Sequence, residues 1–143
     1  MIPETAFVKF LMDSPAINSA VGGRIRPVTA SMADRMPLIV YNRLATRRPI
    51  HLLGDSGLMF LMIQLDIFAK SYSEAKTISE LIRNRVHGYI GQITNGDEVA
   101  SCDIAIVAER DEYVPQNDAS DTGTFHVSLD LDISMNESFT TKA

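Results

Sequence analysis

One segment of the chain combines residue types that a hydrolytic site would use. It is Gly54-Asp55-Ser56-Gly57, with His51 a few residues before it. A nucleophilic serine needs a histidine within hydrogen-bonding reach and a third group that orients the histidine. Here His51 precedes Ser56 in the arm of an expected hairpin, and all four residues are common in turns. We therefore expect a turn and no catalytic residue.

A second set, Asp130-x-Asp132 with His126, could meet on one face of a strand, because alternate strand residues share a face. The spacing of a calcium loop is missing, and His51 and His87 show no ligand spacing with His126. Acidic residues at alternate positions are common on an exposed sheet face. We expect no bound metal.

Cys102 and a glycine pair complete the chemically notable residues. Cys102 lies among alternating apolar residues, where a cysteine usually acts as a small buried hydrophobe. Gly22 and Gly23 follow an expected helix, which is the wrong order for a phosphate-binding loop. We expect no cofactor.

Composition indicates one domain over residues 1–143, with 45% hydrophobic and 22% charged residues. The formal charge of −5 argues against nonspecific attraction to DNA or anionic lipid. The longest apolar run, residues 58–63, is too short to span a membrane, and the N-terminus does not resemble an export signal. We expect residues 136–143 to form a mobile tail.

Periodicity and capping signals predict an α+β fold. Its mainly antiparallel sheet of about four main strands would carry helices on one face and a long protruding β-hairpin. The strands are expected at 24–28 (short), 38–44, 58–69, 101–109 and 125–134. The helical segments are expected at 3–12, 15–21 and 72–87.

The strand over 58–69 predicts a contact surface. Its odd-numbered residues from Met59 to Ala69 are all apolar and must be buried, whereas the other face begins with Leu58, Phe60 and Met62. These three residues are the candidate subunit interface.

Side-chain faces follow from the same period of two. On the 101–109 strand we expect one side to hold Cys102, Ile104, Ile106 and Ala108. On the last strand we expect an outward, solvated side with His126, Ser128, Asp130, Asp132 and Ser134. At the hairpin tip we expect Arg47, Arg48 and His51, either as solvated residues of a turn or as contacts with another protein.

Two blocks of sequence resemble one protein family. The first runs Val21-Gly22-Gly23-Arg24-Ile25-Arg26-Pro27 and leads, after a polar loop, to Pro37-Leu38-Ile39-Val40-Tyr41. The second runs from Met62 through Asp66, Lys70 and Tyr72 into the 72–87 helix. In order and spacing they resemble the tail completion, or tail-to-head joining, proteins of long-tailed bacteriophages and gene-transfer particles. The resemblance covers residues 5–90, and the long polar segment at 111–124 departs from the family.

The resemblance implies a structural virion protein and not an enzyme. It implies a homo-oligomeric ring, usually hexameric, that terminates the tail tube and joins it to the head connector or stopper protein. DNA would pass through without specific binding, and Asp130 and Asp132 are candidates for the channel lining. It also implies a place in the tail or neck of a virion assembled in the bacterial cytoplasm, with no membrane partner.

Two other functions fit the residues. One is a small α+β ligand-binding or enzymatic domain with a cleft between helix and sheet, although the facing sides there are apolar. The other is a dimeric regulatory module that pairs through its hairpin.

Overall fold

The computed structural model describes residues 2–28, 35–114 and 124–136. The elements in chain order are α1 (Pro3–Met12), α2 (Pro15–Val21), β1 (Ile25–Pro27), β2 (Leu38–Arg47), β3 (Ile50–His51), β4 (Gly54–Asp55), β5 (Leu58–Ala69), α3 (Tyr72–Val86), β6 (Tyr89–Asn95), β7 (Glu98–Val114) and β8 (Thr124–Asn136). Of the expected mobile tail, Asn136 is instead the last residue of β8, and residues 137–143 lie outside the described residues, as does most of the 111–124 segment.

The fold is α+β, built on a six-stranded mixed sheet in the order β1-β2-β5-β8-β7-β6. Its β1 pairs parallel to β2, and the other neighbours pair antiparallel. The sheet is thus larger than the four strands expected and not wholly antiparallel. The unexpected strand is β6, which begins directly after the positive-φ Gly88 and contains Gly91. Glycine is unfavourable inside strands, so propensity alone does not indicate this one.

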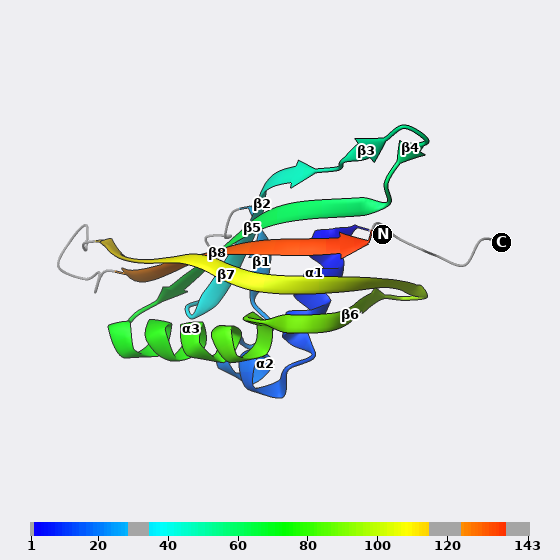
Figure 1. Ribbon diagram of the computed structural model, residues 1–143. Coiled ribbons are helices and arrows are strands. Elements are labelled where there is room, and N and C mark those ends of the chain that lie inside the picture. The colour runs from blue at the N-terminus through cyan, green and yellow to red at the C-terminus, as the bar shows by residue number, and fades with distance from the viewer. Residues whose placement is uncertain (1, 29–34, 115–123, 137–143) are drawn as a thin grey trace.

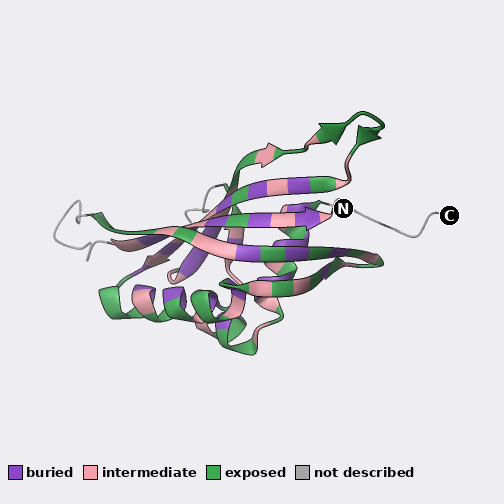
Figure 2. Cartoon of the chain, viewed as in Figure 1, coloured by how far each residue is buried: buried purple, intermediate pink, exposed green. Residues whose placement is uncertain are grey.

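The helices cover one face of the sheet (Figure 1). α3 packs on β5, β7 and β8, while α1 packs on β6 and α2 on α3. The alternate residues of β5 from Met59 to Ala69 are all buried in the core between the layers. Figure 2 shows the resulting alternation of buried and exposed positions along the central strands. The predicted faces of β5 and β8 are confirmed.

Local signals position the helices. The Ser14 side chain caps α2, which ends at Gly22 with a left-handed φ of 57°. The Ser71 hydroxyl accepts a hydrogen bond from the Glu74 N–H at 3.1 Å and caps α3. The buried stripe of α3 contains Ala75, Ile78 and Ile82, which follow the period of the helix.

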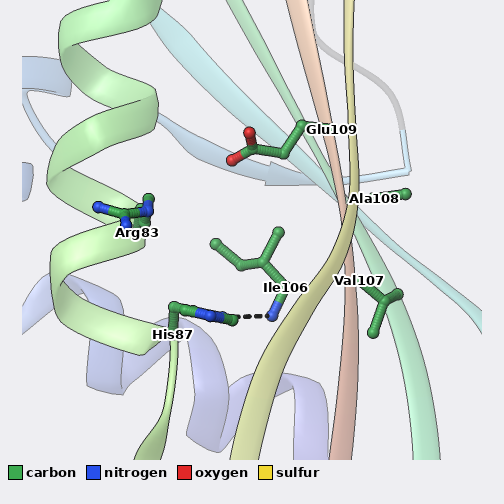
Figure 3. A pocket seen from close by; sticks show the side chains of 6 residues that line it. All are labelled: Arg83, His87, Ile106, Val107, Ala108 and Glu109. Atoms are coloured by element: carbon green, nitrogen blue, oxygen red, sulfur yellow. Dashed lines mark hydrogen bonds between the residues drawn. The ribbon is translucent and has the colours of Figure 1, made fainter.

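The prediction for Ala108 is wrong because β7 contains a bulge. The pairing shifts between Ile106, opposite Leu131, and Ala108, opposite Asp130. Val107 and Ala108 both point away from α3 in Figure 3, whereas Ile106 and Glu109 point toward it. One inserted residue reverses the facing of the strand that follows it.

The hairpin that projects beyond the sheet is confirmed, with β3 and β4 as its paired arms (Figure 1). Its reversal lies at Leu52 and Leu53, between His51 and Gly54, and not within Gly54-Asp55-Ser56-Gly57. The two glycines have positive φ values, 117° at Gly54 and 76° at Gly57, which glycine adopts without steric cost. They shape the returning arm of the hairpin and not its tip.

Candidate functional site

The sheet face that none of the described helices covers, here called the helix-free face, carries the candidate interface residues and the candidate channel-lining residues. In the register of β5 with β8, Phe60 lies opposite Ser134 and Met62 opposite Asp132. The candidate interface and the candidate channel lining are therefore neighbours on one face. Along the strands, this face is apolar at one end and polar at the other.

The apolar end, here called the apolar strip, consists of Leu58, Phe60 and Met62. Leu58 is 44% exposed and Met62 37% exposed, and Phe60 is half-buried. The guanidinium of Arg47 lies 4.6 Å from the centre of the Phe60 ring. Single exposed apolar residues are ordinary, but three on one strand face form a patch that suits a protein contact.

Two shallow depressions flank the apolar strip. One, of about 380 Å³, lies between β2, β5 and β8 and is lined by Phe60, Met62 and Asp132 among others. The second, of about 270 Å³, extends across β8 and β7 to Ile90 of β6. Ile90 is 84% exposed, which widens the apolar surface beyond the three predicted residues.

The polar end holds a connected set of side chains, here called the polar network: Gln64, Asp66, Arg110, Glu112, His126, Ser128 and Asp130. Gln64 Nε2 donates to Ser128 Oγ at 2.8 Å and to Asp66 Oδ1 at 3.1 Å. His126 Nε2 lies 2.8 Å from the same Asp66 oxygen, and its ring stacks on Phe68 with centroids 4.6 Å apart.

Arg110 joins the network to Asp130. Its two terminal nitrogens donate to the two Asp130 carboxylate oxygens at 2.9 and 3.0 Å, and one also donates to Ser128 at 3.1 Å. Hydrogen bonding to Asp130 raises the pKa of Arg110 further above its already high range. The side chain of Asp130 is only 18% exposed.

The two predicted channel-lining residues thus differ. The Asp130 charge is balanced by Arg110, while Asp132 is exposed and adjoins the apolar strip. Ser128 also lies on the outward side of β8 as predicted, but its side chain is buried within the network and is not solvated.

The predicted hairpin contacts lie on the arms and not at the tip. Arg47 ends β2 beside Phe60, and the His51 ring nitrogen Nδ1 accepts a hydrogen bond from the Leu53 N–H at 3.0 Å. The side chains that project farthest into solvent are Leu52, 104% exposed, and Leu53, 93% exposed. Neither leucine was predicted from the sequence, because the glycines of Gly54-Asp55-Ser56-Gly57 indicated the turn more strongly.

A further depression of about 410 Å³ opens between α3 and β7 (Figure 3). Arg83 and His87 line it from the helix side, and Glu109 lines it from the strand. His87 Nδ1 accepts a hydrogen bond from the Ile106 N–H at 3.1 Å, which gives this histidine a structural role.

Chemical groups elsewhere have structural explanations. Within residues 2–28, 35–114 and 124–136, no three His, Cys, Asp or Glu side chains are grouped to hold a metal ion. Burial raises the pKa of the Cys102 thiol to about 11, which keeps it protonated near neutral pH. No helix in the described part of the chain is long and apolar enough to cross a membrane.

The polar network was not predicted from the sequence. The facing of Gln64 and Asp66 follows from the strand period, but their partners on β7 and β8 depend on the register between strands. The bulge at Val107 also places Arg110 on this face, and no local sequence signal marks that bulge.

Comparison with known proteins gives a family and a fold. Residues 5–136 match the family model described as Tail completion protein gp17. No curated protein matches the chain. Among solved structures, a chain in "Virion of native gene transfer agent (GTA) particle" has a similar fold, with 7% sequence identity, 90% coverage of each chain and a TM-score of 0.65.

Proposed function

The chain belongs to the tail completion protein gp17 family, and from this premise we propose that it forms a closed ring at the head-proximal end of a phage-like tail. The family consists of structural virion proteins, so the chain is a structural component of a tailed particle. In the proposed role, the ring ends the tail tube and joins it to the head connector or stopper protein. We propose that the ring contains six subunits and that it is assembled in the bacterial cytoplasm.

The observation that carries this proposal is the apolar strip. Leu58 and Met62 expose more than a third of their surface beside Phe60, and depressions flank all three. Specific protein contacts bury on the order of 1,000 Å² or more between partners. We propose that the strip is covered by a neighbouring subunit in the assembled ring.

The hairpin provides a second contact. It extends beyond the sheet, with Leu52 and Leu53 exposed at the tip and Arg47 and Arg48 near its base. An apolar tip with basic residues nearby suits an acidic surface that has an apolar pocket. We propose that the hairpin reaches a neighbouring ring or the connector.

The polar end of the helix-free face suits a DNA channel. Apart from Arg110, which is paired with Asp130, the charged side chains of the network are acidic or histidine. Such a wall gives phosphates no attractive site, so a duplex can slide along it. We propose that this face lines the channel, with Asp132 as its exposed charge.

Deletion of the gene for this protein tests the proposal. We expect DNA-filled heads and separate tails, counted by electron microscopy, and recovery of joined particles when the intact gene is supplied from a plasmid. If the gene instead encoded an enzyme or a regulator, its deletion could lower the number of particles, but the particles that form would still be joined. Joined particles of normal yield in the deletion strain would contradict the proposal.

A further inference from the structure

Both edges of the sheet are open over part of their length. Among the described residues, β1 pairs with β2 only at residues 39–41, which leaves residues 42–47 of β2 without a strand on that side. At the opposite edge, β6 pairs with β7 only as far as Ile104, which leaves residues 107–114 open. Open strand edges present unpaired backbone donors and acceptors that readily accept another strand.

The backbone groups at both edges belong to residues that face the helices. At the β2 edge, the Ile39 N–H donates to the Arg24 carbonyl. At the β7 edge, the Gly88 N–H donates to the Ile104 carbonyl. Along a strand, successive residues alternate in two ways: in the sheet face to which the side chain points, and in the sheet edge to which the backbone N–H and C=O groups point.

This alternation identifies the free groups. The next helix-facing residues on β2 are Arg43, opposite Ile63, and Thr46, opposite Leu61. Those on β7 are Glu109, Asp111 and Tyr113, opposite the inward residues of β8. The backbone groups of these five residues therefore point out of the sheet at its two edges.

The two open segments carry opposite charge. Residues 42–47 contain two arginines and no acidic residue, while residues 107–114 contain three acidic residues and one arginine. Ion pairs within the subunit engage Arg110 with Asp130, Arg43 with Glu4 and Asp111 with Lys76. Arg47 of the first segment and Glu109 of the second carry opposite charges outside these pairs. Strand pairing between these segments would bring opposite charges together, and each segment paired with itself would bring like charges together.

We propose that residues 42–47 of one subunit pair antiparallel with residues 107–114 of a second copy of this chain. The inference rests on the proposed ring and specifies how its subunits join. Because the two surfaces differ, the contact is heterologous and can close into a ring. The strands β2 and β7 run in opposite directions within the sheet, so rotation of a copy about a ring axis makes the pairing antiparallel.

In both paired segments the backbone groups come from helix-facing residues. The pairing therefore keeps the helices of all subunits on the same face of a continuous wall. The helix-free face then lines the other side. In this arrangement the apolar strip lies at one end of the inner wall, where the hairpin of the neighbouring subunit can cover it.

The geometry is that of a closed sheet. Within one subunit, Thr46 and Ile104 lie in the same row across the sheet, through Leu61 and Ile133. Pairing of Thr46 with Glu109 of the copy, both of which face the helices, displaces the copy by about 14 Å along the strands, while the four strands β2, β5, β8 and β7 together span about 19 Å. The ratio of these two lengths corresponds to a strand tilt of about 35°, within the range of closed barrels.

Engineered disulfides test this contact in assembled particles. In a Cys102→Ala background, Thr46→Cys is combined in turn with Glu109→Cys, Asp111→Cys or Tyr113→Cys. A disulfide tolerates Cα separations of roughly 4.4–6.8 Å, so only the position opposite Thr46 should react. We expect one combination to give a ladder of linked subunits under oxidising conditions. Thr46→Cys alone should give none, and a disulfide dimer from it would contradict the heterologous contact.

Two further measurements test whether cross-linking reflects the proposed strand contact. Thr46→Cys with Gln92→Cys, on the β6 edge outside the proposed contact, should give no ladder. For the unmodified protein, amide hydrogen exchange in residues 42–47 and 107–114 should slow at least about tenfold on assembly, while β6 changes little. Unchanged exchange in both segments would overturn the pairing even where a cysteine variant fails to fold.

The same particles separate this inference from the proposed function. If the protein is found in the neck but neither cross-links nor protection occur at these edges, the edge pairing is wrong and the joining role stands. If the protein is absent from the neck, the proposed function itself is wrong.

Discussion

Replacement of Phe60 by aspartate should block joining of particles and leave the subunit folded. Phe60 is half-buried on the helix-free face, at the centre of the apolar strip. The substitution removes its contact with Arg47, a cation–π pair of about 0.5–1 kcal/mol, and a strand preference of up to about 1 kcal/mol. We therefore expect the free energy of unfolding to fall by about 1–2 kcal/mol, which most folded domains tolerate.

The cost to assembly is larger. A central aromatic residue of an interface typically contributes about 2 kcal/mol or more, equivalent to about 30-fold in affinity for each contact. The new carboxylate would also be buried close to Asp132, the neighbour of Met62 across the strands. In a closed ring the loss recurs at every subunit, so we expect almost no joined particles.

Two control variants separate assembly from folding. Ile2→Asp removes a side chain that is 58% exposed at the start of α1, where an acidic cap suits a helix, and should join normally. Met59→Asp buries a charge at a position only 2% exposed and should prevent folding. Circular dichroism on the purified subunit and counts of joined particles by electron microscopy measure both effects. Normal joining with Phe60→Asp, or equal loss with Ile2→Asp, would refute the reasoning.

Three further predictions follow from the hairpin, the channel face and the buried thiol. Replacing Arg47 and Arg48 by glutamate should abolish head-to-tail joining without changing the melting temperature by more than a few degrees; normal particle yield would favour a solvated arm. Replacing Asp130 and Asp132 by lysine should slow DNA ejection, measured by fluorescence of released DNA, more at low salt than at high salt. Because Asp130 is already paired, Asp132→Lys alone should retain most of the effect. Unchanged ejection at low salt would reject the channel role. Burial raises the pKa of the Cys102 thiol to about 11, against 9.0 for an exposed thiol. The protonated thiol therefore contributes fully to the stability of the fold below pH 9, and this contribution is lost as the pH rises to about 11. At pH 8 the native protein should resist alkylation of Cys102, whereas the denatured protein should be alkylated at once.

The sequence was most informative where the structural signal is local. The period of two along β5 predicted its buried face, and local helix signals predicted α3 at 72–87, close to its observed bounds of Tyr72–Val86. The apolar strip followed from the same period, because a face that is apolar at Leu58 and Phe60 and polar at Gln64 indicates a boundary between contact and solvent.

The sequence was less informative where structure depends on pairing between strands. The bulge at Val107 moves Ala108 to the helix-free face and places Arg110 beside Asp130, and it is set by the register of β7 on β8. The position of the hairpin reversal at Leu52 and Leu53 likewise depends on which residues of β3 and β4 pair. Propensity favoured the glycines there, and the pairing of the arms decided otherwise.

The central claim is tested most directly by an electron cryomicroscopy reconstruction of the neck of intact particles. We predict a closed ring of this chain between the tail tube and the head connector, with the helices outside and Asp132 facing the axis. A neck without this protein, or with its helix-free face turned away from the channel, would contradict the account.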